Sequence, residues 1–209
     1  LPILCTAEHP FYVRKMTRVW DNDRRVDVRT FADPMWVEAK DLSYDDFLAI
    51  PVIATESNSL DLSDDDCYIL GRYLADGHTR KDYRNSENRP NDRHWQLILS
   101  VGNTKLDDTV SKINHKVNVY PHSQSTHRVV ISSKRLVQIA EQHLGCGAIS
   151  KFISPTILNL PKDKLQVFLN GYMDGDGSYI KNKDVWSVST ISRTLSDCLV
   201  LLIAKLYNT

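Results

Sequence analysis

The apolar residues of this chain are spaced differently before and after one polar, acidic stretch. Before it, short segments rich in β-branched and aromatic residues are interrupted by Pro, Asp and Asn, and no 3.6-residue apolar period appears. Residues 1–55 therefore predict an all-β segment of strands and turns. The acidic stretch "ATESNSLDLSDDD" predicts a linker over 56–63, and a helical apolar period begins after it.

The first helix is predicted to start directly after Ser63. This serine is a suitable N-cap, and the three aspartates that follow it face the positive end of the helix. The pattern then predicts the order β-β-α-β-β-α, in which Gly145 ends the last helix. The expected elements are a helix over 64–75, an irregular strand and long turn over 78–94, a strand over 95–101, a helix over 104–116, a hairpin over 117–132 and a helix over 133–144.

The same order of elements starts again roughly a hundred residues later. A helix over 162–175 leads into two short strands, "GSYI" and "VWSVST", and then into another helix. Trp95 and Trp186 lie at matching places, each at the opening of a strand. The repeat predicts a pseudo-symmetric α+β architecture with a first copy at 64–160 and a second at 161–209, which stops before its last hairpin and helix.

The helix that opens each copy carries the same kind of motif. When "YILGRYLADG" and "FLNGYMDGDG" are aligned on Gly71 and Gly171, Asp76 and Asp176 fall at the same offset. Small residues four apart form a flat strip, which lets two helices pack closely and brings their C-terminal ends together. Two carboxylates at negative helix ends repel each other, and a divalent cation such as Mg²⁺ relieves that repulsion. A single Asp-Gly is usually only a turn, but two copies in register indicate metal-assisted phosphodiester hydrolysis.

These two motifs resemble the dodecapeptides of the LAGLIDADG (DOD-type) homing endonucleases, and the elements after the linker resemble their αββαββα repeat. The resemblance implies a monomeric, pseudo-twofold, Mg²⁺-dependent enzyme that cuts both strands of a double-stranded DNA site. Asp76 and Asp176 would be its catalytic metal ligands, and the backbone carbonyls of Ala75 and Gly175 further ligands. The first motif departs from the family pattern at Leu74, where an earlier aspartate is expected.

The resemblance also implies a lysine beside the metal ions and a saddle of β-ribbons in the major groove. Lys151 is the candidate for polarising the attacking water or screening charge. A second such lysine is expected either beyond Thr209 or at Lys181 or Lys183. Residues 77–135 carry eleven Lys and Arg against five Asp and Glu, a net of +6, which fits a DNA-facing surface and equally a solvated one. The candidates for DNA contact are Arg80, Lys81, Arg84, Arg89, Arg93, Gln96, His127, Arg128, Lys181 and Lys183.

The N-terminal segment resembles part of an intein. "TAEHPFYV" is similar to the T-x-x-H block, in which Thr6 and His9 would help to activate the first peptide bond, and "WVEAKDLSYDDFLAIPV" resembles late strands of the Hint splicing fold. The implied partners are the host-protein exteins that flank an intein. Because the chain begins with Leu1 and ends in "LYNT", without the terminal residues that splicing uses, we expect an internal fragment that is inactive alone.

Composition narrows these possibilities only a little. The chain is 42% hydrophobic and 25% charged with zero formal net charge, as in ordinary globular proteins, and its longest apolar run is too short to cross a membrane. Four scattered cysteines without C-x-x-C spacing favour a reduced cytoplasmic setting. Two alternatives stay open: a non-cleaving DNA- or RNA-binding module of maturase type on the same scaffold, and a freestanding homing endonuclease.

Overall fold

The computed structural model describes residues 3–49, 55–86 and 89–207, without the side chains of 82–93. The chain divides into two compact units, Leu1–Val52 and Ile53–Thr209, and each is described by itself. The division lies within a few residues of the linker that the sequence predicts. None of the helices in the described ranges is long and apolar enough to cross a membrane.

The N-terminal unit is all-β, as the spacing of its apolar residues predicts. Strand β1 (Pro10–Asp21) pairs antiparallel with β2 (Val26–Phe31), β3 (Met35–Glu38) and β4 (Asp46–Leu48), and one 3₁₀ turn, η1 (Ala39–Asp41), follows β3. Its buried hydrophobic side chains among the described residues are Val13 and Val37, whereas Trp20 and Trp36 are exposed. The unit therefore covers little of its own apolar surface.

The second unit opens with α1 (Asp64–Asp76), and Ser63 caps this helix as predicted. The Ser63 hydroxyl accepts a hydrogen bond from the backbone N–H of Asp66, and the Asp66 carboxylate accepts one from the backbone N–H of Ser63, each at 3.1 Å. This reciprocal capping box satisfies two helix-end donors. The rest of the helix is buried almost all round, from Cys67 to Leu74.

A four-stranded antiparallel sheet follows, in the order β5-β6-β8-β7. The strands are β5 (Gly77–Ser86), β6 (Arg89–Gly102), β7 (Val117–Pro121) and β8 (Thr126–Ser132). The long turn expected over 78–94 is wrong, because β5 pairs with β6 as far as Ser86 opposite Arg89. This polar segment has too few apolar residues to show the alternation of a strand, so only pairing with its neighbour reveals it.

The remaining elements of the first copy are α2 (Leu106–Ser111), which follows the 3₁₀ turn η2 (Asn103–Lys105), and α3 (Lys134–His143). The helix expected over 104–116 is shorter than predicted. The backbone N–H groups of Asn114 and His115 donate to the Asp65 carboxylate, at 2.8 and 3.0 Å, rather than continuing the helix. Gly145, at φ 76°, follows α3 as its sequence position predicts.

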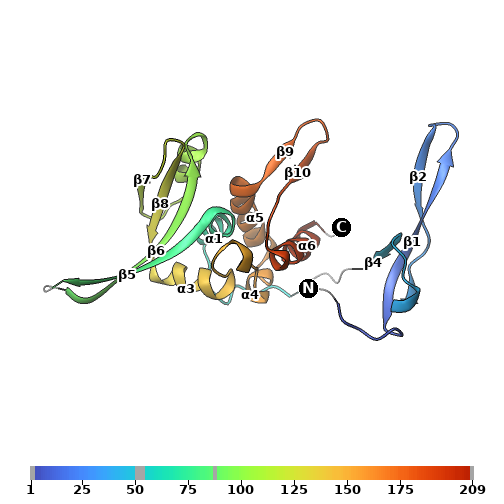
Figure 1. Ribbon diagram of the computed structural model, residues 1–209, viewed down its shortest axis with the longest axis horizontal. Coiled ribbons are helices and arrows are strands. Elements are labelled where there is room, and N and C mark those ends of the chain that lie inside the picture. The colour runs from blue at the N-terminus through green and yellow to red at the C-terminus, as the bar shows by residue number, and fades with distance from the viewer. Residues whose placement is uncertain (1–2, 50–54, 87–88, 208–209) are drawn as a thin grey trace. The chain divides into compact units, whose positions relative to one another are not determined.

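The second copy repeats the order α-β-β-α with shorter strands. Helix α5 (Lys162–Asp176) leads into the hairpin β9 (Ser178–Ile180) and β10 (Val185–Ser187), and then into α6 (Arg193–Tyr207). Between the copies lie the 3₁₀ turn η3 (Ala148–Ser150) and the short helix α4 (Pro155–Leu158), which the sequence did not predict. Figure 1 shows α1 and α5 side by side in the middle of this unit.

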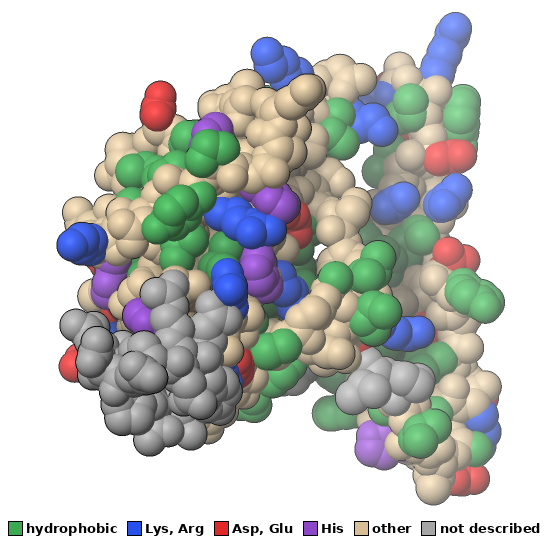
Figure 2. Space-filling model, turned by 60° about the vertical axis from the view of Figure 1, so that its left-hand side comes forward, with side chains coloured by type: hydrophobic (Ala, Val, Ile, Leu, Met, Phe, Trp, Pro, Cys, Tyr) green, Lys and Arg blue, Asp and Glu red, His purple; other side chains and the backbone are tan. Residues whose placement is uncertain are grey.

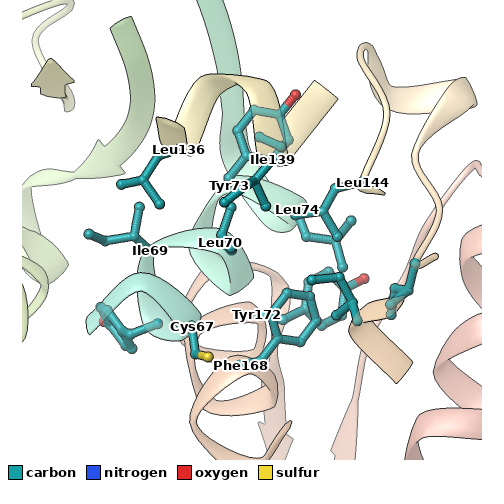
Figure 3. Close-up of a cluster of buried hydrophobic side chains, with 14 of the residues drawn as sticks. Cys67, Ile69, Leu70, Tyr73, Leu74, Leu136, Ile139, Leu144, Phe168 and Tyr172 are labelled. Atoms are coloured by element: carbon teal, nitrogen blue, oxygen red, sulfur yellow. The ribbon is translucent and has the colours of Figure 1, made fainter. Parts of the chain in front are cut away.

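The core of this unit gathers around α1. Its Ile69, Leu70 and Tyr73 side chains pack with Leu136 and Ile139 of α3 (Figure 3). The opposite side of the helix meets Phe168 and Tyr172 of α5, which are fully buried. Helix α1 is covered by α5 on one side and by the sheet and α3 on the other. This packing holds α1 in place and so fixes the position of Asp76 at its C-terminal end.

Candidate metal centre and nucleic-acid face

Helices α1 and α5 touch backbone to backbone at one glycine on each. A Cβ atom on Gly71 would lie 2.0 Å from the Phe168 carbonyl oxygen, and one on Gly171 would lie 2.3 Å from the Tyr68 carbonyl oxygen. No real side chain fits at such distances, so the crossing needs glycine at both positions. The small-residue strips predicted from the two motifs are therefore the contact surface.

The crossing brings the two C-terminal helix ends together, and with them the two predicted carboxylates. A Cβ atom on Gly175 would lie 2.3 Å from the Ala75 Cβ and 3.4 Å from Oδ2 of Asp76. Asp76 is exposed and Asp176 is half-buried. Burial, and then the charge of Asp76, raise the pKa of the Asp176 carboxyl group above its usual value. The two acids lie close enough for the charge of Asp76 to act on Asp176.

Lys151, the predicted catalytic lysine, lies buried at the end of α1. Its Nζ donates to the carbonyl oxygens of Tyr73 and Ala75, both at 2.9 Å, and its side chain is 5% exposed. Burial lowers the pKa of this amine, while the charges of Asp176 and Asp76 oppose that shift. The structure thus places Lys151 beside the carboxylate pair.

Lys105 occupies the corresponding place at the end of α5, and the sequence analysis missed it. Its Nζ donates to the carbonyl oxygens of Asp174 and Gly175, at 2.9 and 3.2 Å, and its charge opposes the rise in the pKa of Asp176. A lysine that bonds the last carbonyls also stabilises the negative end of the helix dipole. The sequence signal that could have pointed to Lys105 was its place as a basic residue just after a predicted strand of the first copy.

These lysines change the expectation for the backbone ligands. The carbonyls of Ala75 and Gly175, predicted as metal ligands, each accept a hydrogen bond from a lysine amine. Within the described ranges, no group of three or more His, Cys, Asp or Glu side chains gathers into a metal site. The two aspartates still form an oxygen-only donor set, and Mg²⁺ commonly binds through one or two carboxylates, water and substrate phosphate. The residues present fit such an ion.

Asp174, the earlier acid of the second motif, has a structural role instead. Its carboxylate accepts hydrogen bonds from the Tyr68 hydroxyl and the Lys112 amine, both at 2.8 Å. These contacts tie α5 to α1 and to the end of α2. In the first motif, the fully buried Leu74 lies in the core, so the departure from the family pattern leaves no charge unpaired there.

The four-stranded sheet presents one polar face. Arg80 lies opposite Gln96 across β5 and β6, and Tyr120 lies opposite Arg128 across β7 and β8. With Ile98, Pro121 and Val130, these side chains line a shallow depression of about 290 Å³. In Figure 2, Lys, Arg and His side chains gather on the forward face of this unit. The predicted contact residues Arg80, Gln96 and Arg128 therefore share one surface.

Two other predicted contact residues lie on the opposite face, because side chains alternate along a strand. Lys81 forms an ion pair with Glu141, and its Nζ lies 4.6 Å from the centre of the Trp95 ring. The Nδ1 atom of His127 lies 3.0 Å from Oδ1 of Asn103. The structure does not bring these two residues to the polar face.

The remaining predicted contact residues fall in two groups. Lys181 and Lys183 are exposed in the turn between β9 and β10. The side chains of Arg84, Arg89 and Arg93 lie outside the part of the chain that is described. One residue that the prediction missed is His78, two positions before Arg80 on β5, whose pKa is lowered by burial and by the charges of Arg128 and Lys151.

The two residues predicted for splicing lie in the N-terminal unit. Thr6 and His9 are exposed in the turn before β1, where the His9 backbone N–H donates to the Thr6 carbonyl oxygen at 3.2 Å. The His9 ring meets Phe11 edge-on, at 5.2 Å between ring centroids. Their roles stay predictions.

No protein-family model matches the chain. It is 28% identical over 148 residues, 66% of its length, to an uncharacterised protein of Methanocaldococcus jannaschii, of which it spans 16%. It is 25% identical over 221 aligned residues to an iron-sulfur cluster assembly SufBD family protein of Mycobacterium tuberculosis, with 96% of the chain and 25% of that protein covered. A DNA-directed RNA polymerase subunit, Rpo1C of Methanocaldococcus jannaschii, is 25% identical over 151 residues, 71% of the chain and 16% of the subunit.

Solved structures that resemble the chain include those of the homing endonuclease I-DmoI. Mesophilic variants of that enzyme match with a TM-score of 0.47 and 13% identity, over 67% of this chain and 75% of theirs. Its complex with DNA and Mn matches with a TM-score of 0.47 and 14% identity, over 69% of this chain and 78% of that one. The chain spans a quarter or less of the length of the curated relatives named above.

Proposed function

We propose that the chain belongs to an intein-borne homing endonuclease of the LAGLIDADG type, which cuts both strands of a specific DNA site with a divalent cation, preferentially Mg²⁺. The observation that carries this proposal is the meeting of Asp76 and Asp176 at the C-terminal ends of two helices that cross at glycines. Paired acids at negative helix ends are unfavourable without a cation, which supports a metal-binding role.

Each residue of this centre has a distinct proposed task. Asp76 and Asp176 would hold the cation, which when bound supplies charge stabilisation and lowers the pKa of water. Lys151, held against the end of α1 by two carbonyls, would place its positive charge where negative charge develops on the phosphate. Lys105 would do the same from the end of α5.

The polar face of the sheet would bind the DNA. Arg80, Gln96 and Arg128 lie on one surface at strand positions from which side chains reach base edges or phosphates in a major groove. Lys181 and Lys183, at the tip of the second hairpin, would contact phosphates at the other half of the site.

Two observations support the intein as the carrier. The matched relatives have unrelated names, and the match covers only 16–25% of each, as a self-contained element inserted into different proteins predicts. The N-terminal unit leaves large apolar side chains such as Trp36 uncovered, as part of a larger β domain would. Thr6 and His9 are the proposed splicing residues of that unit, and flanking host segments its partners.

A cleavage assay tests the proposal. The full-length protein that carries this chain is incubated with Mg²⁺ and a DNA in which the coding sequences flanking the element are joined directly. We expect a double-strand break that both Asp76→Asn and Asp176→Asn abolish while DNA binding persists. Specific binding without any break would overturn the nuclease proposal.

One observation favours a second candidate, a non-cleaving DNA- or RNA-binding module. Lysines already bond the carbonyls of Ala75 and Gly175, so the centre offers fewer open metal ligands than predicted. For such a module, Ca²⁺ and Mg²⁺ would leave DNA affinity unchanged in the same assay. A freestanding endonuclease, the third possibility, would cut the DNA but lack splicing of its flanks.

A further inference from the structure

A buried cation, two of whose nitrogens have no hydrogen-bond partner in the described part of the chain, lies near the carboxylate pair. The Arg72 side chain on α1 is 1% exposed, and its Nε and Nη1 atoms have no hydrogen-bond partner among the described residues. The hydroxyl of Tyr172 on α5, which is 0% exposed, is also without a partner in the same part of the chain. Guanidinium groups stay charged, and burying one without a partner is costly, so the charge needs an explanation.

The geometry directs this charge toward the two acids. Arg72 stands four residues before Asp76, which puts the two side chains on one face of α1. A Cβ atom on Gly175 would lie 2.6 Å from Arg72 Nη1, so the missing side chain of Gly175 makes room for the guanidinium at the end of α5. The same hypothetical Cβ lies 3.4 Å from Oδ2 of Asp76, so the guanidinium and this carboxylate both border one position on α5, without a hydrogen bond from Nη1 to the carboxylate.

The two lysines of the centre share this electrostatic role, because the charges of Lys151, Arg72 and Lys105 all act on Asp176. Lys151 and Lys105 donate to backbone carbonyls, so their hydrogen bonds serve the helix ends. Arg72 Nε and Nη1 have no hydrogen-bond partner among the described residues, and the charge of Arg72 acts on Asp176 through space. A positive charge at short range in a poorly hydrated site acts strongly on neighbouring charges.

We infer that Arg72 is a resident counter-cation of the Asp76–Asp176 pair, alongside Lys151. Without a bound divalent ion, its charge offsets part of the repulsion between the two carboxylates and helps to keep the helix ends together. A divalent ion then has to bind against the repulsion of Arg72, so this residue lowers the metal affinity of the centre. The first part of this inference, that Arg72 offsets carboxylate repulsion, stands on the buried charge alone. The second part, that Arg72 weakens metal binding, rests on the proposed metal-dependent function.

The first part is tested without metal, by thermal unfolding of the full chain in EDTA at neutral pH. Arg72→Met keeps the side-chain volume and removes the charge, so we expect a lower Tm. Adding Asp176→Asn to that variant should raise the Tm by several degrees, because it removes carboxylate repulsion. The same Asp176→Asn change in the unaltered chain should leave the Tm unchanged or lower it.

Matched variants separate charge from packing. Tyr172→Phe removes the other unpartnered group but no charge, and Arg72→Lys keeps the positive charge. In both backgrounds, Asp176→Asn should change the Tm as it does in the unaltered chain. If Arg72→Met does not fold, Arg72→Gln serves as the neutral variant. An effect of Asp176→Asn with the same sign and size in every background would overturn the counter-cation role.

The second part is tested by titrating Ca²⁺ into the folded variants in a calorimeter. Arg72→Met should bind Ca²⁺ on the order of tenfold more tightly than the unaltered chain, and Asp76→Asn should lose binding. If Asp76→Asn loses Ca²⁺ binding but Arg72→Met binds Ca²⁺ no more tightly than the unaltered chain, Arg72 does not compete with the divalent ion and the second part is overturned. Equal binding by Asp76→Asn and the unaltered chain would instead overturn the metal centre itself, while the metal-free result would stand.

Discussion

Gly71 and Gly171 lie on opposite sides of one helix crossing, and each faces the backbone of the other helix. A Cβ atom on Gly71 would meet the Phe168 carbonyl oxygen at 2.0 Å, and one on Gly171 would meet that of Tyr68 at 2.3 Å. Phe168 and Tyr68 each stand three residues before the glycine of their own helix, so the contact is reciprocal. This crossing decides which side chains lie beside the carboxylates.

Substituting either crossing glycine should therefore separate the helix ends. We expect Gly71→Ala or Gly171→Ala to lower the free energy of unfolding by about 3 kcal/mol or more, because the methyl group overlaps a backbone carbonyl. Urea unfolding followed by circular dichroism measures this. Gly102→Ala is the control, since its Cβ would have only the Ser125 carbonyl oxygen nearby, at 3.9 Å. Equal loss in all three variants would contradict a specific crossing.

The two faces of the sheet predict opposite results for neighbouring residues. Arg80→Ala and Arg128→Ala should weaken DNA binding at all salt concentrations and reduce the slope of log K against log salt by about one each. Lys81→Ala and His127→Ala, one residue away on the other face, should leave that slope unchanged. Fluorescence anisotropy with a labelled duplex at several KCl concentrations measures both. A larger loss from Lys81→Ala than from Arg80→Ala would contradict the assignment of the faces.

Asp66 connects the start of α1 to α3, and its partners should be needed for stability. Arg135 Nη1 donates to the buried Asp66 carboxylate at 2.9 Å, and Nη2 donates to the carbonyls of Leu60 and Asp61. Arg135→Met should cost about 1–3 kcal/mol, because it leaves a buried carboxylate short of donors. The exposed neighbour Lys134→Met should cost less than about 0.5 kcal/mol in the same urea titration. Equal costs would show that the Asp66 contact contributes no stability.

His143 should make the stability of this unit fall as the solution becomes acidic. Burial lowers the pKa of this histidine in the folded state, and its Nδ1 lies 2.9 Å from the Ser154 hydroxyl oxygen. The folded state then binds fewer protons than the unfolded one, so stability is full above the ordinary pKa of about 6.5 and declines as the pH falls through and below it. Comparing Tm at pH 7.5 and pH 5 measures the decline.

The matched variants for this prediction differ in burial. His143→Gln should reduce the loss of Tm between the two pH values, because the buried titrating group is gone. His122→Gln, at an exposed position, should leave the loss as it is. If both variants behave alike, the pH dependence comes from other groups, such as His78, whose pKa is lowered as well.

Several features of the fold followed from local sequence. The N-cap at Ser63, the helix end before Gly145 and the repeated order of helices and strands depend on residues within a few positions of each other. Such signals act through hydrogen bonds and backbone preferences inside one turn of the chain. The polar segment of β5 was predicted only as an irregular strand and a long turn, because it lacks the apolar alternation that would show how far the strand continues.

The two similar helices that each end in an aspartate were evident from the order of residues, and their small residues predicted that these ends would meet. What surrounds the meeting point depends on how distant parts of the chain pack together. Lys105 reaches the end of α5 across 70 positions, Lys151 reaches the end of α1 across 76, and Arg72 becomes buried between the helices. The physical reason is that periodicity specifies which face of an element is apolar, whereas packing and register specify which distant side chains reach a given carbonyl or carboxylate.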